Sequence, residues 1–217
     1  MATQSARTQI YLVIEAGPSA LAQVQAALGA MPTIAAVLIR GGAAALDATS
    51  ARPLVEFVQK ADVAALIEGD AALARALRAD GVHLPWSPGL RAAYDEAREI
   101  LGTRFMVGAG IAIDAEVARH DAMELAEATA DYIGFEPSVA GDLDVQSEFA
   151  SWWAEIFQVP CVVFGVADAT AARDFAQMGV DFIGVDLPAN SSPADCAARV
   201  ASIGEALATA SKKGAIA

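Results

Sequence analysis

The sequence contains few cysteines and few histidines. Its 217 residues include two of each, and Cys161 and Cys196 are too few to form the disulfide framework of a small secreted domain. Cys161 lies within an apolar stretch and is interpreted as a small core residue. The two histidines do not occur at zinc-ligand spacing with cysteines or carboxylates, so the sequence indicates no zinc site.

The sequence also has no long hydrophobic run. Its apolar runs have the length of strands and are interrupted by charges or glycine, whereas a membrane helix needs about 20 apolar residues. The first nine residues, MATQSARTQ, contain no apolar signal core. We therefore expect a cytoplasmic protein without a membrane segment.

Positive charge is scarce. The chain has 14 Lys and Arg against 27 Asp and Glu, which gives a formal net charge of −13. Such a surface repels nucleic acids and anionic membranes and attracts cations over a long range. In a chain with 55% hydrophobic residues, the acids also serve solubility. We expect a small-molecule ligand and no nucleic-acid or membrane partner, and a homodimer stays an open alternative.

What the sequence does contain is a regular series of short apolar runs separated by alanine-rich stretches. Apolar strands that alternate with helices are typical of a parallel sheet covered by helices, and eight such units favour closure into a barrel. We predict a single α/β domain, a (β/α)8 TIM barrel over residues 1–217 with its core at about 10–210. The predicted strands are 10–14, 34–39, 63–67, 81–84, 105–107, 132–135, 161–164 and 182–185.

Capping residues support the helices between these strands. Asp70, Asp168 and Ser192 each precede a predicted helix and can accept a hydrogen bond from its first amides. A long loop follows the sixth strand. Its residues, EPSVAGDLDVQ at 136–146, show no regular spacing of apolar side chains. A long loop at the carboxyl end of a barrel strand is a usual position for function, although its two aspartates alone are a weak indication of a cation site.

Six segments occur in an order that is typical of one protein family. They are AVLIRGG at 36–42, ADGVHL at 79–84, FMVGAG at 105–110, ADYIGFEP at 130–137, PCVVFGV at 160–166 and MGVDFIGV at 178–185. Together they resemble segments of the thiamine phosphate synthase and TenI superfamily, and the resemblance extends over most of residues 10–188. It implies a (β/α)8 barrel whose ligand site lies at the carboxyl ends of the strands.

The resemblance also implies an activity. The family joins a pyrimidine diphosphate to a thiazole phosphate, and the departing pyrophosphate requires Mg²⁺ and cationic side chains to balance its charge. The two aspartates that hold Mg²⁺ in the family correspond here to Gly69 and Pro88, and neither supplies a carboxylate oxygen. We therefore expect no cofactor, although the family would use Mg²⁺.

The phosphate-binding residues that the resemblance implies are also largely replaced. Of the family's Gln, Arg and Lys on the second strand, only Arg40 remains, and a lysine-containing motif after the sixth strand has no counterpart. The serine of the fifth strand is Gly110, and the glycine pair of the thiazole phosphate site is Gly165-Val166. Asp186 lies where other phosphate-facing residues would be, and a carboxylate in contact repels phosphate by a few kcal/mol, on the order of 4. Phosphate groups are expected to bind weakly there.

Charged side chains recur where the predicted strands end. They are Glu15, Arg40, Glu68, His83, Glu136 and Asp186. Because the carboxyl ends of barrel strands converge, a shared location predicts a net negative pocket for a cation, an amine or a metal. The alternative is that several of them point outward, since side chains alternate along a strand.

Three of these residues are candidate catalytic residues. Glu68 occupies the position of a pocket asparagine in the family, and we predict that it forms a salt bridge with Arg40 or acts as a general base. His83 is either a site residue or a hydrogen-bonded core residue. Trp86, at the rim, can stack on a ring or cover a cation, or it can seal a shortened loop. Gly110, Glu136, Gly165 and Asp186 complete the predicted ligand site.

The leading hypothesis is a divergent member of the family with lost or altered catalysis, which binds a small heteroaromatic or cationic ligand. The second is an active thiamine phosphate synthase with replaced catalytic residues. The third is a TenI-like thiazole tautomerase, although the pocket histidine of that enzyme corresponds here to Ala112. A regulatory or partner-binding protein is the fourth.

Overall fold

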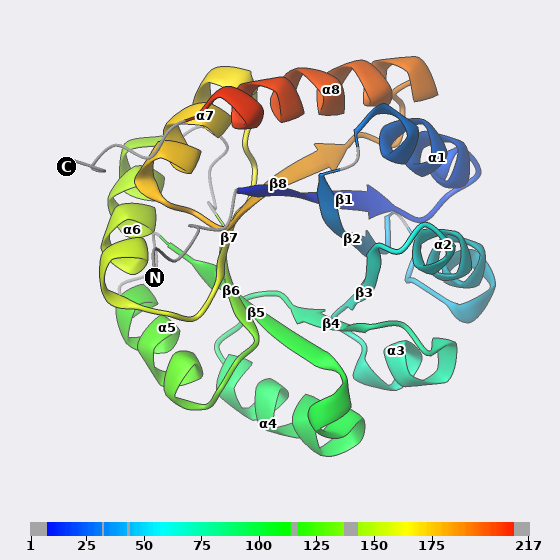
Figure 1. The fold of residues 1–217 in the computed structure, drawn as a ribbon. Coiled ribbons are helices and arrows are strands. Elements are labelled where there is room, and N and C mark those ends of the chain that lie inside the picture. The colour runs from blue at the N-terminus through cyan, green and yellow to red at the C-terminus, as the bar shows by residue number, and fades with distance from the viewer. Residues whose placement is uncertain (1–7, 32, 43, 114–116, 137–142, 211–217) are drawn as a thin grey trace, which may run out of the picture.

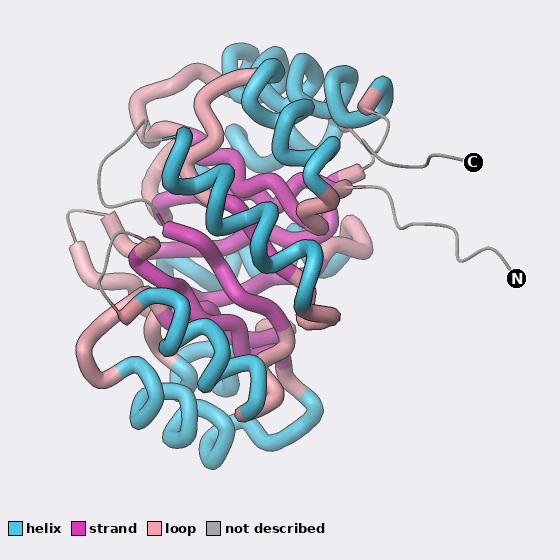
Figure 2. Tube along the Cα trace, turned by 90° about the vertical axis from the view of Figure 1, so that its left-hand side faces the viewer, coloured by secondary structure: helices cyan, strands magenta, loops and turns pink. Residues whose placement is uncertain are grey.

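The chain forms a closed barrel of eight parallel strands in the order β1 to β8, surrounded by helices (Figure 1). The computed structural model describes residues 8–31, 33–42, 44–113, 117–136 and 143–210. Seen from the side, the strands lie inside a layer of helices that cross them obliquely (Figure 2). The predicted (β/α)8 barrel is therefore confirmed.

The strands are β1 (Gln9–Glu15), β2 (Ile34–Arg40), β3 (Ala64–Glu68), β4 (Gly81–Leu84), β5 (Met106–Ala112), β6 (Tyr132–Glu136), β7 (Cys161–Val163) and β8 (Phe182–Leu187). The helices are α1 (Ala20–Ala30), α2 (Ala48–Lys60), α3 (Ala71–Leu77), α4 (Leu90–Leu101), α5 (Ala118–Glu127), α6 (Leu143–Ile156), α7 (Ala169–Met178) and α8 (Pro193–Thr209), with a short 3-10 helix η1 (Gly102–Arg104). The largest difference from prediction is β5, which continues five residues beyond its expected end at 107.

The predicted helix caps are present. Asp70 accepts a hydrogen bond from the backbone N of Leu73 at 2.8 Å, and Asp168 accepts from the backbone N of Thr170 at 2.8 Å. Ser192 accepts from the backbone N of Asp195 at 3.1 Å. These bonds satisfy amides that have no partner within a helix. A further cap, the Asp47 capping box of α2, was not predicted.

Helix α3 ends after Leu77, because Arg78 adopts the left-handed conformation with φ 56°. The backbone N of Arg78 donates to carbonyls of the last turn, which is the usual hydrogen bonding of a left-handed cap.

Buried side chains form two clusters. The larger lies between the strands and the helices. The smaller fills the barrel interior with Tyr11, Val13, Ala36, Leu38, Leu66, Tyr132, Val162 and Phe164. Glycines leave room for its rings, because a Cβ at Gly108 would lie 2.0 Å from the Tyr132 ring and one at Gly184 would lie 2.6 Å from the Phe164 ring. The barrel interior is therefore a packed core and not a pore.

Both cysteines are buried and free. Burial is the main cause that raises the pKa of the Cys161 thiol to about 12, so this thiol is inert at neutral pH. None of the helices described by the structure is long and apolar enough to cross a membrane.

Candidate functional site

The alternation of side chains along the strands places the charged residues at the barrel mouth. Side chains two residues apart on a strand face the same side. Val13, Leu38 and Leu66 belong to the interior cluster, and two residues further on lie Glu15, Arg40 and Glu68 at the last positions of β1, β2 and β3. Two other strands show the same pattern. Glu136 ends β6, four residues after Tyr132 of the interior cluster, and Asp186 lies on β8, two residues after Gly184.

Arg40 forms its salt bridges with two carboxylates other than the predicted one. Its Nη2 lies 3.5 Å from Oε1 of Glu15 and 3.4 Å from Oδ1 of Asp186. The predicted salt bridge with Glu68 is wrong: none joins these two side chains in the part of the chain that the structure describes. Strand register gives the reason, because Arg40 pairs directly with Glu15 across β1 and β2. Two carboxylates on that side attract the guanidinium more than one on β3 does.

Two mouth carboxyls have pKa values above their ordinary range. Burial raises the pKa of Glu68, while Arg40 and His83 oppose the rise and Glu136 adds to it. Burial also raises the pKa of Asp186, again opposed by Arg40. Burial disfavours an ionised carboxylate unless a positive charge balances it. At the mouth, four carboxyl groups, those of Glu15, Glu68, Glu136 and Asp186, thus share one arginine, Arg40.

A chain of hydrogen bonds runs from the mouth into the barrel interior. Oε1 of Glu136 lies 2.9 Å from Nε2 of His83, and Nδ1 of His83 lies 3.0 Å from the hydroxyl oxygen of Tyr132. The Tyr132 hydroxyl is in turn 2.7 Å from that of Tyr11. His83 has no exposed surface, and its ring stacks on that of Tyr132 with centroids 5.7 Å apart. His83 is therefore a hydrogen-bonded core residue that also touches the mouth.

The direction of these bonds follows from chemistry. When Glu136 is a carboxylate and the His83 ring is neutral, His83 donates from Nε2–H to Glu136, and its Nδ1 accepts the Tyr132 hydroxyl proton. Tyr132 then accepts from Tyr11. Burial is the main cause that raises the pKa of both tyrosines well above 10, so both remain protonated. A carboxylate oriented by a histidine in this way can accept a proton from a ligand.

The surroundings of Glu136 fix its position. A Cβ on Gly110 would lie 2.3 Å from Oε1 of Glu136, so glycine at 110 makes room for the carboxylate. The backbone N of Trp86 lies 3.5 Å from Oε2 of Glu136, and the Trp86 indole nitrogen donates to Asp121 on α5 at 3.3 Å. Trp86 also packs against the large core cluster. These contacts hold Trp86 between α5, Glu136 and the core.

The positions that would serve Mg²⁺ and phosphate do not fit those groups. Gly69 (φ 71°) donates from its backbone N to the carbonyl of His83, and Pro88 lies in the loop before α4, so neither offers a carboxylate. No group of three or more His, Cys, Asp or Glu side chains is arranged to hold a metal ion among the residues described. Gly165 is exposed with φ 72° at the end of β7, whereas the Val166 side chain is buried. Asp142 of the long loop lies outside the described residues.

Two members of this hydrogen-bond chain, Tyr11 and Tyr132, were not predicted from the sequence. Each lies four residues before an acidic residue on its own strand, Glu15 and Glu136, and therefore on the same face. That spacing was available in the sequence and would have placed both hydroxyls beneath the mouth. Their contact across the barrel was not available, because β1 and β6 are not neighbouring strands.

Comparison with known proteins places these observations in a family. The family described as thiamine monophosphate synthase matches residues 10–186. A thiamine-phosphate synthase of Erythrobacter litoralis is 34% identical over 142 residues, which are 62% of this chain and 63% of that protein. One of Rhodospirillum centenum is 34% identical over 159 residues, which are 69% of this chain and 70% of that protein. The match thus spans less than two thirds of the Erythrobacter protein.

Solved structures share the fold. A thiamine phosphate pyrophosphorylase from Pyrococcus furiosus superposes with a TM-score of 0.70 at 19% identity, covering 95% of this chain and 98% of that one. A tryptophan synthase structure from Mycobacterium tuberculosis superposes with a TM-score of 0.73 at 13% identity, covering 94% and 93%. At these identities the likeness shows the barrel fold alone, since one fold carries many chemistries.

Proposed function

Because the chain belongs to the thiamine monophosphate synthase family, we propose that it binds a small cationic or heteroaromatic molecule at the barrel mouth. In this proposal the Mg²⁺-dependent release of pyrophosphate is lost. The support is that the sequence resemblance matches Gly69 and Pro88 to the metal-binding carboxylates of the family. The bound molecule would be recognised by carboxylates and rings.

The observation that carries the proposal is the charge of the mouth. Glu15, Glu68, Glu136 and Asp186 are balanced by one guanidinium, that of Arg40, which two of them share. Burial raises the pKa of Glu68 and of Asp186, so each ionised carboxylate there costs free energy. A ligand cation about 4 Å from one carboxylate would gain on the order of 4 kcal/mol at a surface-like dielectric before desolvation costs.

Aromatic side chains pack in the barrel interior beneath the mouth. The Phe164 ring lies with its centroid 5.2 Å from that of His83 and 5.4 Å from that of Tyr11. Aromatic side chains favour stacked or edge contacts with another ring. A charged heteroaromatic ring would therefore meet carboxylates at its edge and an aromatic surface below it.

Calorimetry with thiamine as the probe tests the proposal, because thiamine has a cationic ring and no phosphate. Thiamine is expected to bind at least tenfold more tightly than thiamine phosphate, and Glu68→Gln is expected to weaken thiamine binding by tenfold or more. Glu205→Gln, an exposed glutamate on α8, is the matched control and should change affinity by less than twofold. Tighter binding of thiamine phosphate, or equal losses in both variants, would reject a cation-selective mouth.

A second candidate function is proton transfer, in the manner of a tautomerase. The supporting observation is the bonded pair of Glu136 and His83 at 2.9 Å. In such a reaction the Glu136 carboxylate would remove a proton from a ligand carbon, the ligand would hold the electron pair, and the protonated carboxyl would return the proton at another atom. Incubation of a thiazole tautomer in D2O, followed by proton NMR, would detect exchange that Glu136→Gln abolishes. Exchange at the uncatalysed rate would exclude this function.

A further inference from the structure

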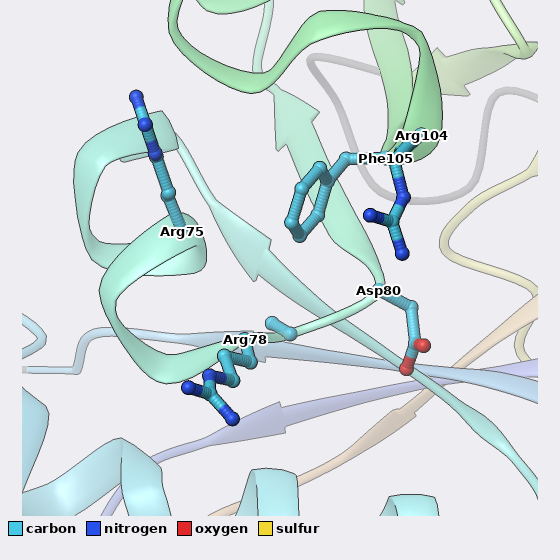
Figure 3. A pocket seen from close by; sticks show the side chains of 6 residues that line it. Arg75, Arg78, Asp80, Arg104 and Phe105 are labelled. Atoms are coloured by element: carbon cyan, nitrogen blue, oxygen red, sulfur yellow. The ribbon is translucent and has the colours of Figure 1, made fainter.

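A second cavity opens at the opposite end of the barrel from the mouth. It has a volume of about 570 Å³ and lies where β4 and β5 begin. Its lining residues are Arg75, Arg78, Ala79, Asp80, Arg104 and Phe105 (Figure 3). This volume falls within the range of about 300–1,000 Å³ that is usual for small-molecule sites.

The charge of this cavity is opposite to that of the chain. Three of the chain's 14 basic residues line it, and with Asp80 as its one acid the lining carries three positive charges and one negative charge. The whole chain has a net charge of −13. A local excess of arginine on an acidic protein marks a position where an anion would be held by contact.

Most guanidinium groups of the cavity have no hydrogen-bond or salt-bridge partner among the described residues. In the part of the chain that the structure describes, the side chains of Arg78 and Arg104 form no hydrogen bond and no salt bridge, while Arg75 donates to the Ile100 carbonyl at 3.1 Å. The nearby Arg98 differs, since it bonds to Asp131 and to the Phe105 carbonyl. The donors of Arg78 and Arg104 are thus available to a ligand.

Asp80 does not neutralise these arginines. Its Oδ2 accepts from the backbone N of Ala65 at 2.8 Å and from Nε2 of Gln59 at 3.2 Å. These bonds tie the start of β3 and the end of α2 to the turn before β4. Asp80 therefore stabilises the barrel by these hydrogen bonds. Among the residues described, no salt bridge joins Asp80 to an arginine.

Arg78 has a backbone conformation that is unusual for an arginine. Arg78 has φ 56° at the end of α3, a conformation that glycine adopts without strain. Arg75 and Arg78 can complement the dipole at the end of the helix, but α3 has only seven residues. Helix stability alone gives little reason to place an arginine where glycine is less strained.

We propose that this cavity is a second binding site, for an organic phosphate held by the arginine side chains of its lining. Guanidinium groups bind phosphate through paired hydrogen bonds. Figure 3 shows the Phe105 ring between Arg104 on one side and Arg75 and Arg78 on the other, and this ring is only partly buried. Phe105 provides a flat apolar surface for the organic part of the ligand. The site does not depend on the function of the mouth.

AMP, pyrophosphate and adenosine are suitable probes, measured by calorimetry on the full chain. AMP is expected to bind with a dissociation constant below 1 mM, on the order of 0.1 mM, and adenosine at least tenfold more weakly. Arg78→Ala/Arg104→Ala is expected to weaken AMP binding by tenfold or more, and Phe105→Leu to weaken AMP binding but not pyrophosphate binding. Arg52→Ala/Arg173→Ala removes two exposed arginines elsewhere and should leave AMP binding within twofold.

Backbone amide chemical shifts locate the bound probe. AMP is expected to shift the amides of Arg78, Asp80 and Phe105 and to leave those of the mouth unchanged. Shifts confined to the mouth would overturn the proposal, as would equal losses in the two double variants. No detectable AMP binding at 10 mM would also overturn it. Unfolding curves of Arg78→Lys, which keeps the charge, control for folding: a stable Arg78→Lys variant that retains AMP binding supports the site.

Discussion

The hydrogen bonds between Tyr11, Tyr132 and His83 can be tested by removing one hydroxyl at a time. The Tyr132 hydroxyl contacts the Tyr11 hydroxyl at 2.7 Å and Nδ1 of His83 at 3.0 Å, and all three side chains are buried. Tyr132→Phe removes both bonds. It leaves two buried polar groups without their partner in the chain, one on Tyr11 and one on His83.

The expected costs differ between the two tyrosines. A buried polar group that loses its partner costs about 1–3 kcal/mol, so Tyr132→Phe should lower the free energy of unfolding by about 2–4 kcal/mol. Tyr11→Phe removes one bond and leaves Tyr132 still donating to His83, so its cost should be about 1 kcal/mol. The double variant leaves only His83 unpaired and should cost no more than Tyr132→Phe alone.

Urea denaturation of the four proteins measures the coupling. The two losses should be less than additive by about 1 kcal/mol. Additive losses, or equal losses for the two single variants, would refute the proposed chain of donors and acceptors. Tyr94→Phe is a useful comparison, because the Tyr94 hydroxyl bonds to Arg98 and the Ala128 carbonyl and is not part of this chain.

Three further predictions concern the mouth. Burial raises the pKa of Glu68 in the folded state. Ionisation of Glu68 therefore lowers the stability of the fold as pH rises through that pKa. Below the pKa of the unfolded state, near 4.3, Glu68 is neutral and this loss of stability is absent. Glu68→Gln should therefore raise the Tm by roughly 2–4 °C at pH 8 and leave the Tm unchanged at pH 3.5. Thermal melts that show an equal rise at both pH values would contradict a role for Glu68 ionisation. Arg40→Met should destabilise the wild-type chain at pH 7 more than it destabilises the Asp186→Asn chain, because Arg40 bonds to Asp186, and urea melts giving equal losses would remove that coupling. With Gly69 and Pro88 at the metal positions, a coupling assay with Mg²⁺, pyrimidine diphosphate and thiazole phosphate should detect no product, whereas turnover above about 1 s⁻¹ would show an active synthase.

The salt-bridge partners of Arg40 could not be predicted from the sequence. The family position of Glu68 and the order of strands suggested that Arg40 would turn toward β3. In a closed barrel β1 also adjoins β8, so Arg40 has Glu15 beside it and Asp186 one strand beyond. Only closure of the sheet brings residues 15, 40 and 186 together, and the guanidinium follows the larger negative charge.

The sequence by itself determined the barrel, its helix caps and the mouth charges. Apolar strands that alternate with helices favour a parallel sheet covered by helices, eight such units favour a barrel, and period-two alternation fixes which side chains share a face. Asp70, Asp168 and Ser192 act locally, within one helical turn. Such local and periodic features can be read along the chain.

Only the tertiary structure decided which of these side chains meet. Tyr11 contacts Tyr132 across 121 residues, and His83 contacts Glu136 across 53. The arginines of the second cavity come from two separate connections, before β4 and before β5. The choice of partner depends on strand stagger, on the space that Gly108 and Gly110 leave for the side chains opposite them, and on the sum of nearby charges, and none of these is local to a stretch of sequence.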